Sequence, residues 1–135
     1  MHLPITAMTL AFCALLTVVL GLNIVRLRLR NKIGLGTKGN SQLEIAMRAH
    51  ANLIEQASMT VLLLLLAEIQ RLDLTTLKVA AILFCASRCL HAYGFIVAKG
   101  GASLFRTLGT AITWLTMIGL SAANITMALN QPSMF

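Results

Sequence analysis

Apolar residues form four long runs along the chain, and short polar or charged segments separate these runs. The first run has no charged residue between Leu3 and Val25, and four basic residues follow it, ending at Lys32. A membrane-spanning helix needs about 20 consecutive and mostly apolar residues. A signal peptide carries its basic residues before the apolar run, which is the reverse of the order in this chain. We therefore predict a spanning helix over residues 3–25.

The second predicted helix begins after a polar loop that contains several glycines. Ser41 is a candidate helix cap, and Glu44 lies where a capping box places its acidic residue. The uncharged stretch from Gln56 to Ala67 is only 12 residues long, which is too short to cross a bilayer alone. The spanning helix must include upstream polar residues, and we predict it over residues 41–69.

Two further helices follow the same pattern. The third is predicted over residues 74–97 and contains Arg88 and His91 within its apolar sequence. A turn with two glycines comes next, and the fourth helix is predicted over residues 103–129, with Arg106 in its first turn. The expected fold class is therefore all-α: an integral membrane four-helix bundle.

Composition indicates a membrane protein with one domain. Of the 135 residues, 58% are hydrophobic and 11% are charged, and the mean hydropathy is +0.84. Four spans use nearly the whole chain, so we interpret residues 1–135 as a single transmembrane domain in the lipid bilayer. Three cysteines lie inside apolar runs without metal-ligand spacing. We predict no metal site and interpret Cys13, Cys85 and Cys89 as small core residues.

The basic residues are distributed unevenly, which predicts the orientation in the membrane. The net charge is +7, but the basic residues flank apolar runs, so no nucleic-acid partner is expected. The segment from Arg26 to Arg48 carries six Lys or Arg residues, the segment from Glu68 to Lys78 carries two, and the chain ends carry none. By the positive-inside rule, the first and third loops face the cytoplasm and both termini lie on the opposite side.

Polar side chains within the second and third helices fall at a similar depth. Arg48, Asn52 and Glu55 are spaced i, i+4 and i+7, so they share one helix face. His50 points nearly the opposite way. Glu55 lies about 10 Å below the membrane surface, and Arg88 reaches a similar depth in the third helix. We therefore expect Arg88 and Glu55 to meet, and Glu55 to be buried.

Two interpretations of these charged residues differ in function. An ionisable group at such depth costs at least about 2.5–3.5 kcal/mol and is normally paired, so Arg88 and Glu55 could be a purely structural ion pair. The alternative is an anion site, because four arginines outnumber Glu55 near this level: Arg26, Arg48, Arg88 and Arg106. The planar guanidinium suits carboxylates and thiolates, and we favour the anion site.

Two further expectations follow from position along the helices. Arg88, His91 and Phe95 are spaced i, i+3 and i+7 and should share one face of the third helix. Glu68 lies near the end of its helix and should be close to a membrane interface. Replacing Glu55 by glutamine is therefore expected to disturb the protein more than the same change at Glu68.

The segment from Arg48 to Glu55, Arg-Ala-His-Ala-Asn-Leu-Ile-Glu, resembles the RxHxNxxE signature of the MAPEG family, the membrane-associated proteins in eicosanoid and glutathione metabolism. Other segments fall where that family places polar residues: Val25-Arg26-Leu27-Arg28, Ser87-Arg88-Cys89-Leu90-His91 and Arg106-Thr107. The resemblance extends over essentially the full chain and is to small bacterial inner-membrane members. It implies four-helix subunits that assemble as a homotrimer in the inner membrane.

The resemblance also implies a glutathione site between neighbouring subunits, near the cytoplasmic face. The family's glutathione contacts would correspond to Arg26, Arg48, Asn52, Glu55, Arg88, His91 and Thr107, and its thiolate-stabilising arginine to Arg106. A cation near a thiol lowers the pKa of that thiol and raises the thiolate fraction at neutral pH. The implied function is a glutathione-dependent transferase or peroxidase, similar to glutathione S-transferases, that detoxifies hydrophobic electrophiles dissolved in the membrane.

Three positions depart from the family pattern, and two other functions stay open. Ser58 replaces a common proline, while Phe95 and Thr110 stand where well-studied synthases carry tyrosine, so we expect no eicosanoid chemistry. One alternative is a non-catalytic membrane module that binds glutathione or a lipid. The other is a small four-span efflux transporter, in which a membrane glutamate exchanges protons for cationic drugs; the excess of arginine argues against it.

Overall fold

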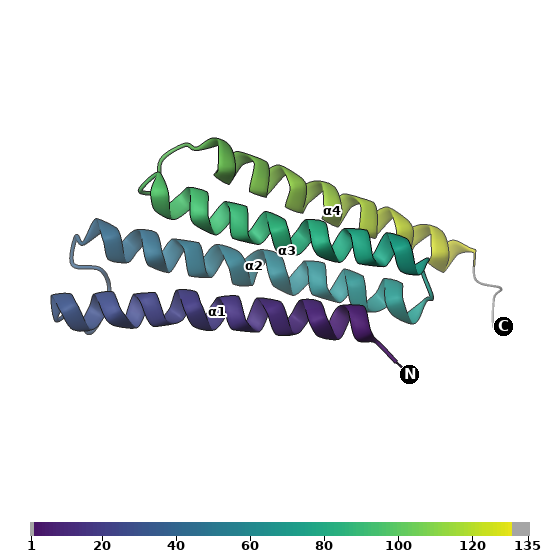
Figure 1. Ribbon diagram of the computed structural model, residues 1–135, viewed down its shortest axis with the longest axis horizontal. Helices are drawn as coiled ribbons and strands as arrows, with labels where there is room; N and C mark the ends of the chain where they lie inside the picture. The colour runs from purple at the N-terminus through teal and green to yellow at the C-terminus, as the bar shows by residue number, and fades with distance from the viewer. Residues whose placement is uncertain (1, 131–135) are drawn as a thin grey trace.

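The computed structural model describes residues 2–130, and its four α-helices run up and down in alternation (Figure 1). Their bounds are α1 Pro4–Asn31, α2 Ser41–Ile69, α3 Leu74–Val97 and α4 Leu104–Leu129. The described residues contain no strand, which confirms the expected all-α class. Each helix is long and apolar enough to cross a membrane. The shortest, α3, measures about 36 Å at 1.5 Å per residue.

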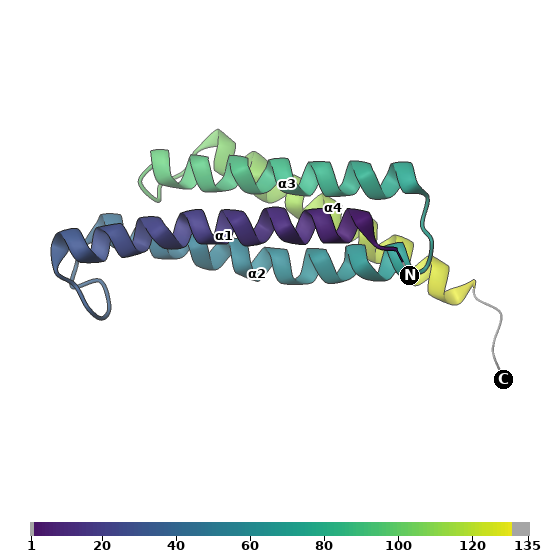
Figure 2. The same cartoon turned by 60° about the horizontal axis from the view of Figure 1, so that its bottom comes forward.

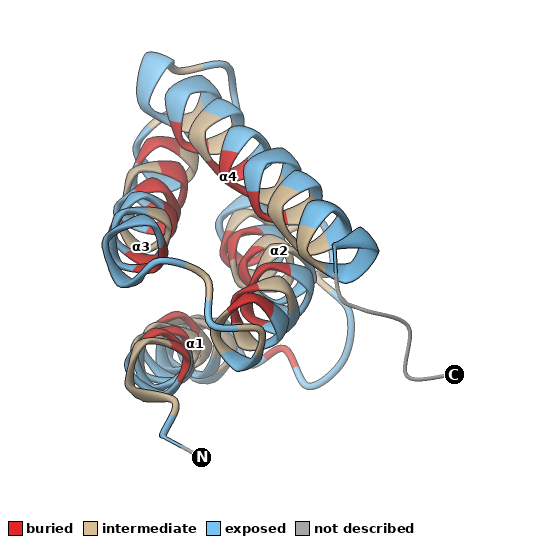
Figure 3. Ribbon diagram, turned by 90° about the vertical axis from the view of Figure 1, so that its right-hand side faces the viewer, coloured by how far each residue is buried: buried red, intermediate tan, exposed pale blue. Residues whose placement is uncertain are grey.

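The four helices pack as a bundle around a narrow interior. α3 packs most extensively against α4, and α1 packs most extensively against α2. Viewed along the bundle, buried residues lie on the sides that the helices turn toward one another (Figure 3). α4 runs obliquely behind α1 and α3 (Figure 2), and within residues 2–130 it does not contact α1. Many large apolar side chains face outward, as suits helices surrounded by lipid.

Two helix boundaries differ from the predicted ones. α1 continues to Asn31, beyond the predicted end at Val25, because basic residues are good helix formers and lie favourably at a helix C-terminus. The cap of α2 is Asn40 instead of Ser41. The Asn40 side chain accepts a hydrogen bond of 2.9 Å from the backbone N–H of Leu43. Several basic residues predicted for the first loop therefore belong to the end of α1.

The N-terminus of α1 is capped by a side chain from another helix. Its own N-cap residue, Leu3, provides no side-chain hydrogen bond. Glu68 of α2 accepts one hydrogen bond from the backbone N–H of Ile5 (3.0 Å) and one from that of Thr6 (2.8 Å). A carboxylate suits this position because it satisfies free N–H groups at the positive end of the helix dipole. Glu68 is therefore a structural link between α1 and α2.

Two glycines allow α3 and α4 to approach closely. A Cβ on Gly94 of α3 would overlap the backbone nitrogen of Arg106. A Cβ on Gly109 of α4 would lie 2.7 Å from both the backbone nitrogen of His91 and the carbonyl oxygen of Ser87. Small residues at such crossings bring helix backbones together in membrane proteins. The two glycines thus fix the first part of α4 against the last part of α3, where several predicted site residues lie.

The three cysteines are free and differ in burial. Cys13 is buried, Cys85 is partly buried, and Cys89 is exposed. The interpretation as small core residues is confirmed for Cys13 and wrong for Cys89. An apolar run in a membrane helix does not reveal which face is buried, because lipid accepts a small apolar side chain as readily as the protein core does.

Candidate functional site

The side chain of Arg88 lies inside the bundle and joins three helices. Arg88 belongs to α3 and is 2% exposed. Its Nη1 donates a hydrogen bond to Oδ1 of Asn52 on α2, at 3.1 Å. Its Nη2 donates to the carbonyl oxygen of Gly109 at 3.0 Å and to Oγ1 of Thr113, both on α4. One guanidinium therefore links α2, α3 and α4.

Hydroxyl groups fix the acceptors around Arg88. Oγ1 of Thr113 donates to the carbonyl oxygen of Gly109 (2.8 Å) and lies 2.8 Å from Oγ of Ser87, with which it shares a hydrogen bond. The single hydroxyl proton of Ser87 is donated either to Oγ1 of Thr113 or to the carbonyl oxygen of Phe84, which lies 2.7 Å away. Ser87 and Thr113 are both fully buried. Sequence reasoning did not single out Thr113, although a hydroxyl within an apolar span is a signal for hydrogen bonding between helices.

No carboxylate balances the positive charge of Arg88 within residues 2–130. The expected contact between Arg88 and Glu55 is wrong: Asn52, about one turn earlier on α2, takes the position toward Arg88. Glu55 is exposed instead of buried. The Nε of Arg88 is buried and has no acceptor in this part of the chain. A buried charge without a partner is costly, so Arg88 is a candidate contact for an anion.

A second group of site residues stacks toward the end of α3. The rings of His91 and Phe95 have centroids 6.0 Å apart and planes inclined by 14°, which confirms that these two residues share a face. The guanidinium carbon of Arg106 lies 4.7 Å from the centroid of the Phe95 ring, a cation–π arrangement. Nη1 of Arg106 donates to the carbonyl oxygens of Gly100 (2.9 Å) and Gly101 (3.1 Å). The turn after α3 therefore holds Arg106 beside Phe95.

The remaining predicted site residues lie on the outside of the chain. Four of them are exposed: Arg26, Arg48, Glu55 and Thr107. The hydroxyl of Thr107 donates within its own helix end, to the carbonyl oxygen of Ser103 at 3.1 Å. One chain therefore brings half of the predicted site toward its interior and leaves the other half uncovered.

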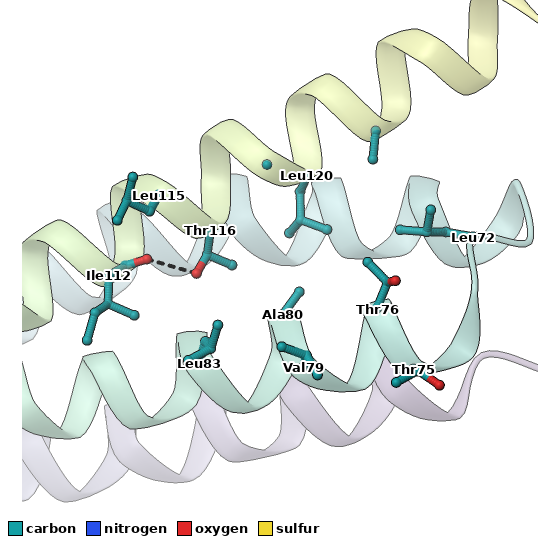
Figure 4. Close-up of a pocket in the computed structure, with 12 residues that line it drawn as sticks. Leu72, Thr75, Thr76, Val79, Ala80, Leu83, Ile112, Leu115, Thr116 and Leu120 are labelled. Carbon is teal, nitrogen blue, oxygen red and sulfur yellow. Dashed lines mark hydrogen bonds between the residues drawn. The ribbon is translucent and has the colours of Figure 1, made fainter.

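Two hollows in the surface differ in their chemistry. One, of about 480 Å³, is lined by Arg106, Thr107 and Trp114 together with glycines of the preceding turn. Another, of about 510 Å³, lies between α3 and α4 on the side of the α2–α3 turn and is shown in Figure 4. Its lining is apolar apart from threonine hydroxyls, and that of Thr116 donates to the carbonyl oxygen of Ile112 (2.8 Å). Of these two hollows, the one beside Arg106 is therefore the one suited to an anion.

One further arginine has a structural role that the sequence did not indicate. Nη1 of Arg28 donates to three carbonyl oxygens of the turn after α1, those of Ile33 (3.3 Å), Gly34 (3.3 Å) and Gly36 (3.2 Å). Its Nη2 lies 3.4 Å from Sδ of Met47 on α2. These contacts hold the turn against α2. The guanidinium of Arg28 therefore already has hydrogen-bond partners within its own chain.

Known proteins match nearly the whole chain. The model of the MAPEG family matches residues 6–126, from α1 into α4. The chain is 27% identical over 121 residues to "Inner membrane protein YecN" of Escherichia coli strain K12, a match that covers 90% of each chain. The protein of the same name from Escherichia coli O6:H1 matches to the same extent. With four apolar helices, these relatives support a multi-pass inner-membrane protein.

Proposed function

This chain belongs to the MAPEG family, and we propose that it is a glutathione-dependent membrane transferase or peroxidase that acts on hydrophobic electrophiles. The family is generally associated with glutathione. One observation carries the proposal: the cation of Arg88 is buried between three helices, and no acidic side chain among residues 2–130 pairs with it. A bound anion would compensate this charge.

Glutathione fits the distribution of charge and free donors. At neutral pH its carboxylates outnumber its ammonium group, and ionisation of the thiol adds a further negative charge. The buried Nε of Arg88 lacks an acceptor, and only Nη1 of the Arg106 fork makes hydrogen bonds within residues 2–130. Hydrogen bonds from guanidinium to carboxylate are among the strong ones in proteins. These unused donors are suited to the carboxylates and the thiolate of glutathione.

We assign binding to seven residues and activation of the thiol to one. The binding residues are Arg26, Arg48, Asn52, Glu55, Arg88, His91 and Thr107. Arg106 would stabilise the thiolate, because a nearby cation lowers the pKa of a thiol. The thiolate then attacks an electrophile that reaches the site from the surrounding lipid.

The uncovered site residues support a homotrimer, which is part of the proposal. Arg26, Arg48 and Glu55 lie on the outside of α1 and α2, and charged groups at membrane depth are costly unless protein or water surrounds them. A neighbouring copy would cover them, and the family resemblance sets the number of copies at three. Native mass spectrometry in a mild detergent that preserves activity should find trimers. Monomers or dimers alone would contradict the assembly.

The orientation in the membrane is also a proposal. The end of the bundle that carries the first and third loops holds most of the basic residues, so this end should face the cytoplasm. A fusion reporter that is active only in the cytoplasm should be inactive at the C-terminus. Activity there would reverse the orientation and leave the chemistry of the site unchanged.

Turnover tests the proposed function. Purified protein is mixed with glutathione and chlorodinitrobenzene, and the conjugate is followed by its absorbance above the uncatalysed rate. We expect a rate that saturates with glutathione. Arg48→Gln should weaken glutathione binding. Arg71→Gln should not, because Arg71 is an exposed residue of the turn after α2, at the opposite end of the bundle. The absence of both conjugate formation and glutathione binding would overturn the proposal.

One observation favours a second function, glutathione binding without turnover. Arg106 already contacts the carbonyl oxygens of Gly100 and Gly101 and the ring of Phe95. The guanidinium of Arg106 is therefore already engaged by groups of its own chain, which would limit how far it stabilises a thiolate. The same measurements separate the two functions, because glutathione binding without conjugate formation from several electrophiles would support the second.

A further inference from the structure

The basic end of the bundle contains a hollow separate from the one beside Arg106. It has a volume of about 410 Å³ and lies between the last turns of α1, the first turns of α2 and the end of α3. Its polar lining residues are Asn23, Ser41, Gln42 and Lys99. Within residues 2–130 the side chains of these four residues make no hydrogen bond or ion pair. The hollow therefore presents one cation and three unused polar groups.

The lining is polar at the mouth, apolar along the walls and polar again at Asn23, further inside. The first turn of α2 and Lys99, which follows α3, lie at the mouth of the hollow. Leu27 of α1 and Ile45 of α2 form apolar walls. Asn23 lies one helical turn before Leu27 in α1, about 6 Å deeper into the bundle. A matching ligand has an anionic head, a hydrogen-bond acceptor below it and an apolar tail.

The charge around the hollow also favours an anionic ligand. Eight of the 11 Lys and Arg residues belong to this end of the bundle: Arg26, Arg28, Arg30, Lys32, Lys38, Arg48, Lys99 and Arg106. Acidic residues are fewer here, namely Glu44 and, further inside, Glu55. Basic residues near a membrane surface attract anionic lipids. The hollow thus lies in the most basic region of a chain that spans a bilayer.

We propose that this hollow binds an anionic phospholipid. The phosphate meets Lys99 and the polar side chains that begin α2, and the glycerol backbone lies between Leu27 and Ile45. An ester carbonyl accepts a hydrogen bond from the Asn23 amide, and the acyl chains continue beyond Asn23 toward the middle of the bilayer. Basic pockets between membrane helices are suited to such head groups. None of the lining residues is assigned to the thiol site, so the lipid site does not depend on the proposed catalysis.

Thermal unfolding of delipidated protein tests the proposal. Phosphatidylglycerol and phosphatidylethanolamine with the same acyl chains are added to separate samples. Phosphatidylglycerol should raise the Tm more, because a ligand that binds only the folded state stabilises it. Lys99→Gln should weaken the apparent affinity for phosphatidylglycerol about fivefold, which corresponds to about 1 kcal/mol.

Lys38 provides a matched control for Lys99. Both lysines are exposed, and both have a left-handed backbone, with φ of 47° at Lys38 and 49° at Lys99. Lys38 lies in the turn between α1 and α2 and does not line the hollow. Lys38→Gln should therefore keep the preference for phosphatidylglycerol that Lys99→Gln loses. Equal effects of the two lipids, or equal losses in the two variants, would overturn the proposal.

Three further measurements distinguish the lipid from other ligands. Asn23→Leu should weaken phosphatidylglycerol binding, and unchanged binding would contradict the assigned orientation of the lipid. Soluble glycerol phosphate should stabilise the protein much less than the lipid, and an equal effect would show a site for free phosphate instead. Glutathione should not displace the lipid, since displacement would make the hollow part of the thiol site.

Discussion

Nη1 of Arg88 lies 3.1 Å from Oδ1 of Asn52, so a buried cation is bound by a neutral amide where a carboxylate was expected. A neutral acceptor satisfies the hydrogen bond but leaves the charge uncompensated. This difference separates a site for an anion from an ion pair that only joins helices. A carboxylate at residue 52 therefore distinguishes the two interpretations of Arg88, because it should weaken the binding of an anion only if Arg88 belongs to an anion site.

Asn52→Asp places a carboxylate beside Arg88 with little change in shape. The fold should be retained or stabilised, because the buried guanidinium gains a counter-charge. Glutathione affinity should fall about tenfold or more, since Arg88 would then be neutralised within the chain. Titration calorimetry measures the affinity, and chemical unfolding measures the stability. Unchanged glutathione affinity would show that the free charge of Arg88 does not contribute to binding.

Thr113→Val removes an acceptor of Arg88 while keeping the shape of the side chain. Thr113 bonds to Arg88 and Ser87 of a neighbouring helix, so we expect the free energy of unfolding to fall by about 1–3 kcal/mol. Thr116→Val is the matched control, because the Thr116 hydroxyl bonds only to Ile112 of its own helix within the described residues. Equal losses for the two variants would show that the network around Arg88 adds nothing to stability.

A methyl group at either close crossing of α3 and α4 should separate the two helices. Gly94→Ala and Gly109→Ala each place a Cβ against backbone atoms, so each should lower the free energy of unfolding by about 1–3 kcal/mol. Gly119 of α4 has no atom within 4 Å of the corresponding Cβ. Gly119→Ala should be neutral or stabilising by up to about 1 kcal/mol. Similar losses at all three positions would contradict the close approach.

Glu68→Gln should loosen the start of α1 from α2. The amide keeps one acceptor but loses the charge beside the helix N-terminus, so the expected loss of stability is about 0.5–1 kcal/mol. Glu44→Gln is the control, since Glu44 is exposed and its side chain bonds to nothing within residues 2–130. Hydrogen exchange at Ile5 and Thr6 should be faster only in Glu68→Gln. For one chain, these contacts predict a larger loss of stability from Glu68→Gln than from Glu55→Gln, whereas the sequence predicted the reverse order.

The length and hydropathy of the apolar runs were sufficient to predict an all-α chain with four spanning helices. The burial of Arg88 was also predictable, because a charge inside an apolar run has to turn toward protein or water. The extension of α1 to Asn31 could not be predicted, because hydropathy shows where the apolar run ends and does not show where the helix ends. Basic residues are good helix formers, so a helix can continue through them into water after the apolar run has ended.

The partner of Arg88 could not be predicted because helical spacing gives a direction on one helix only. Asn52 and Glu55 are three residues apart and differ by about 60° around the axis of α2. The rotation of α2 against α3 decides which of them faces Arg88. Close backbone contacts at Gly94 and Gly109 bring α4, which carries the other acceptors of Arg88, against α3. In the sequence those glycines are simply weak helix formers.

The pH titration of bound glutathione tests the proposed role of Arg106 most directly. Ultraviolet absorbance reports the thiolate, and turnover is measured on the same samples of wild type, Arg106→Ala and Arg106→Lys. We predict an apparent thiol pKa below that of free glutathione in the wild type and a raised value in Arg106→Ala. Turnover in Arg106→Ala should fall much more than glutathione affinity, and Arg106→Lys should recover part of it. A bound thiol that titrates like free glutathione in the wild type, or identically in Arg106→Ala, would contradict the proposed thiolate site.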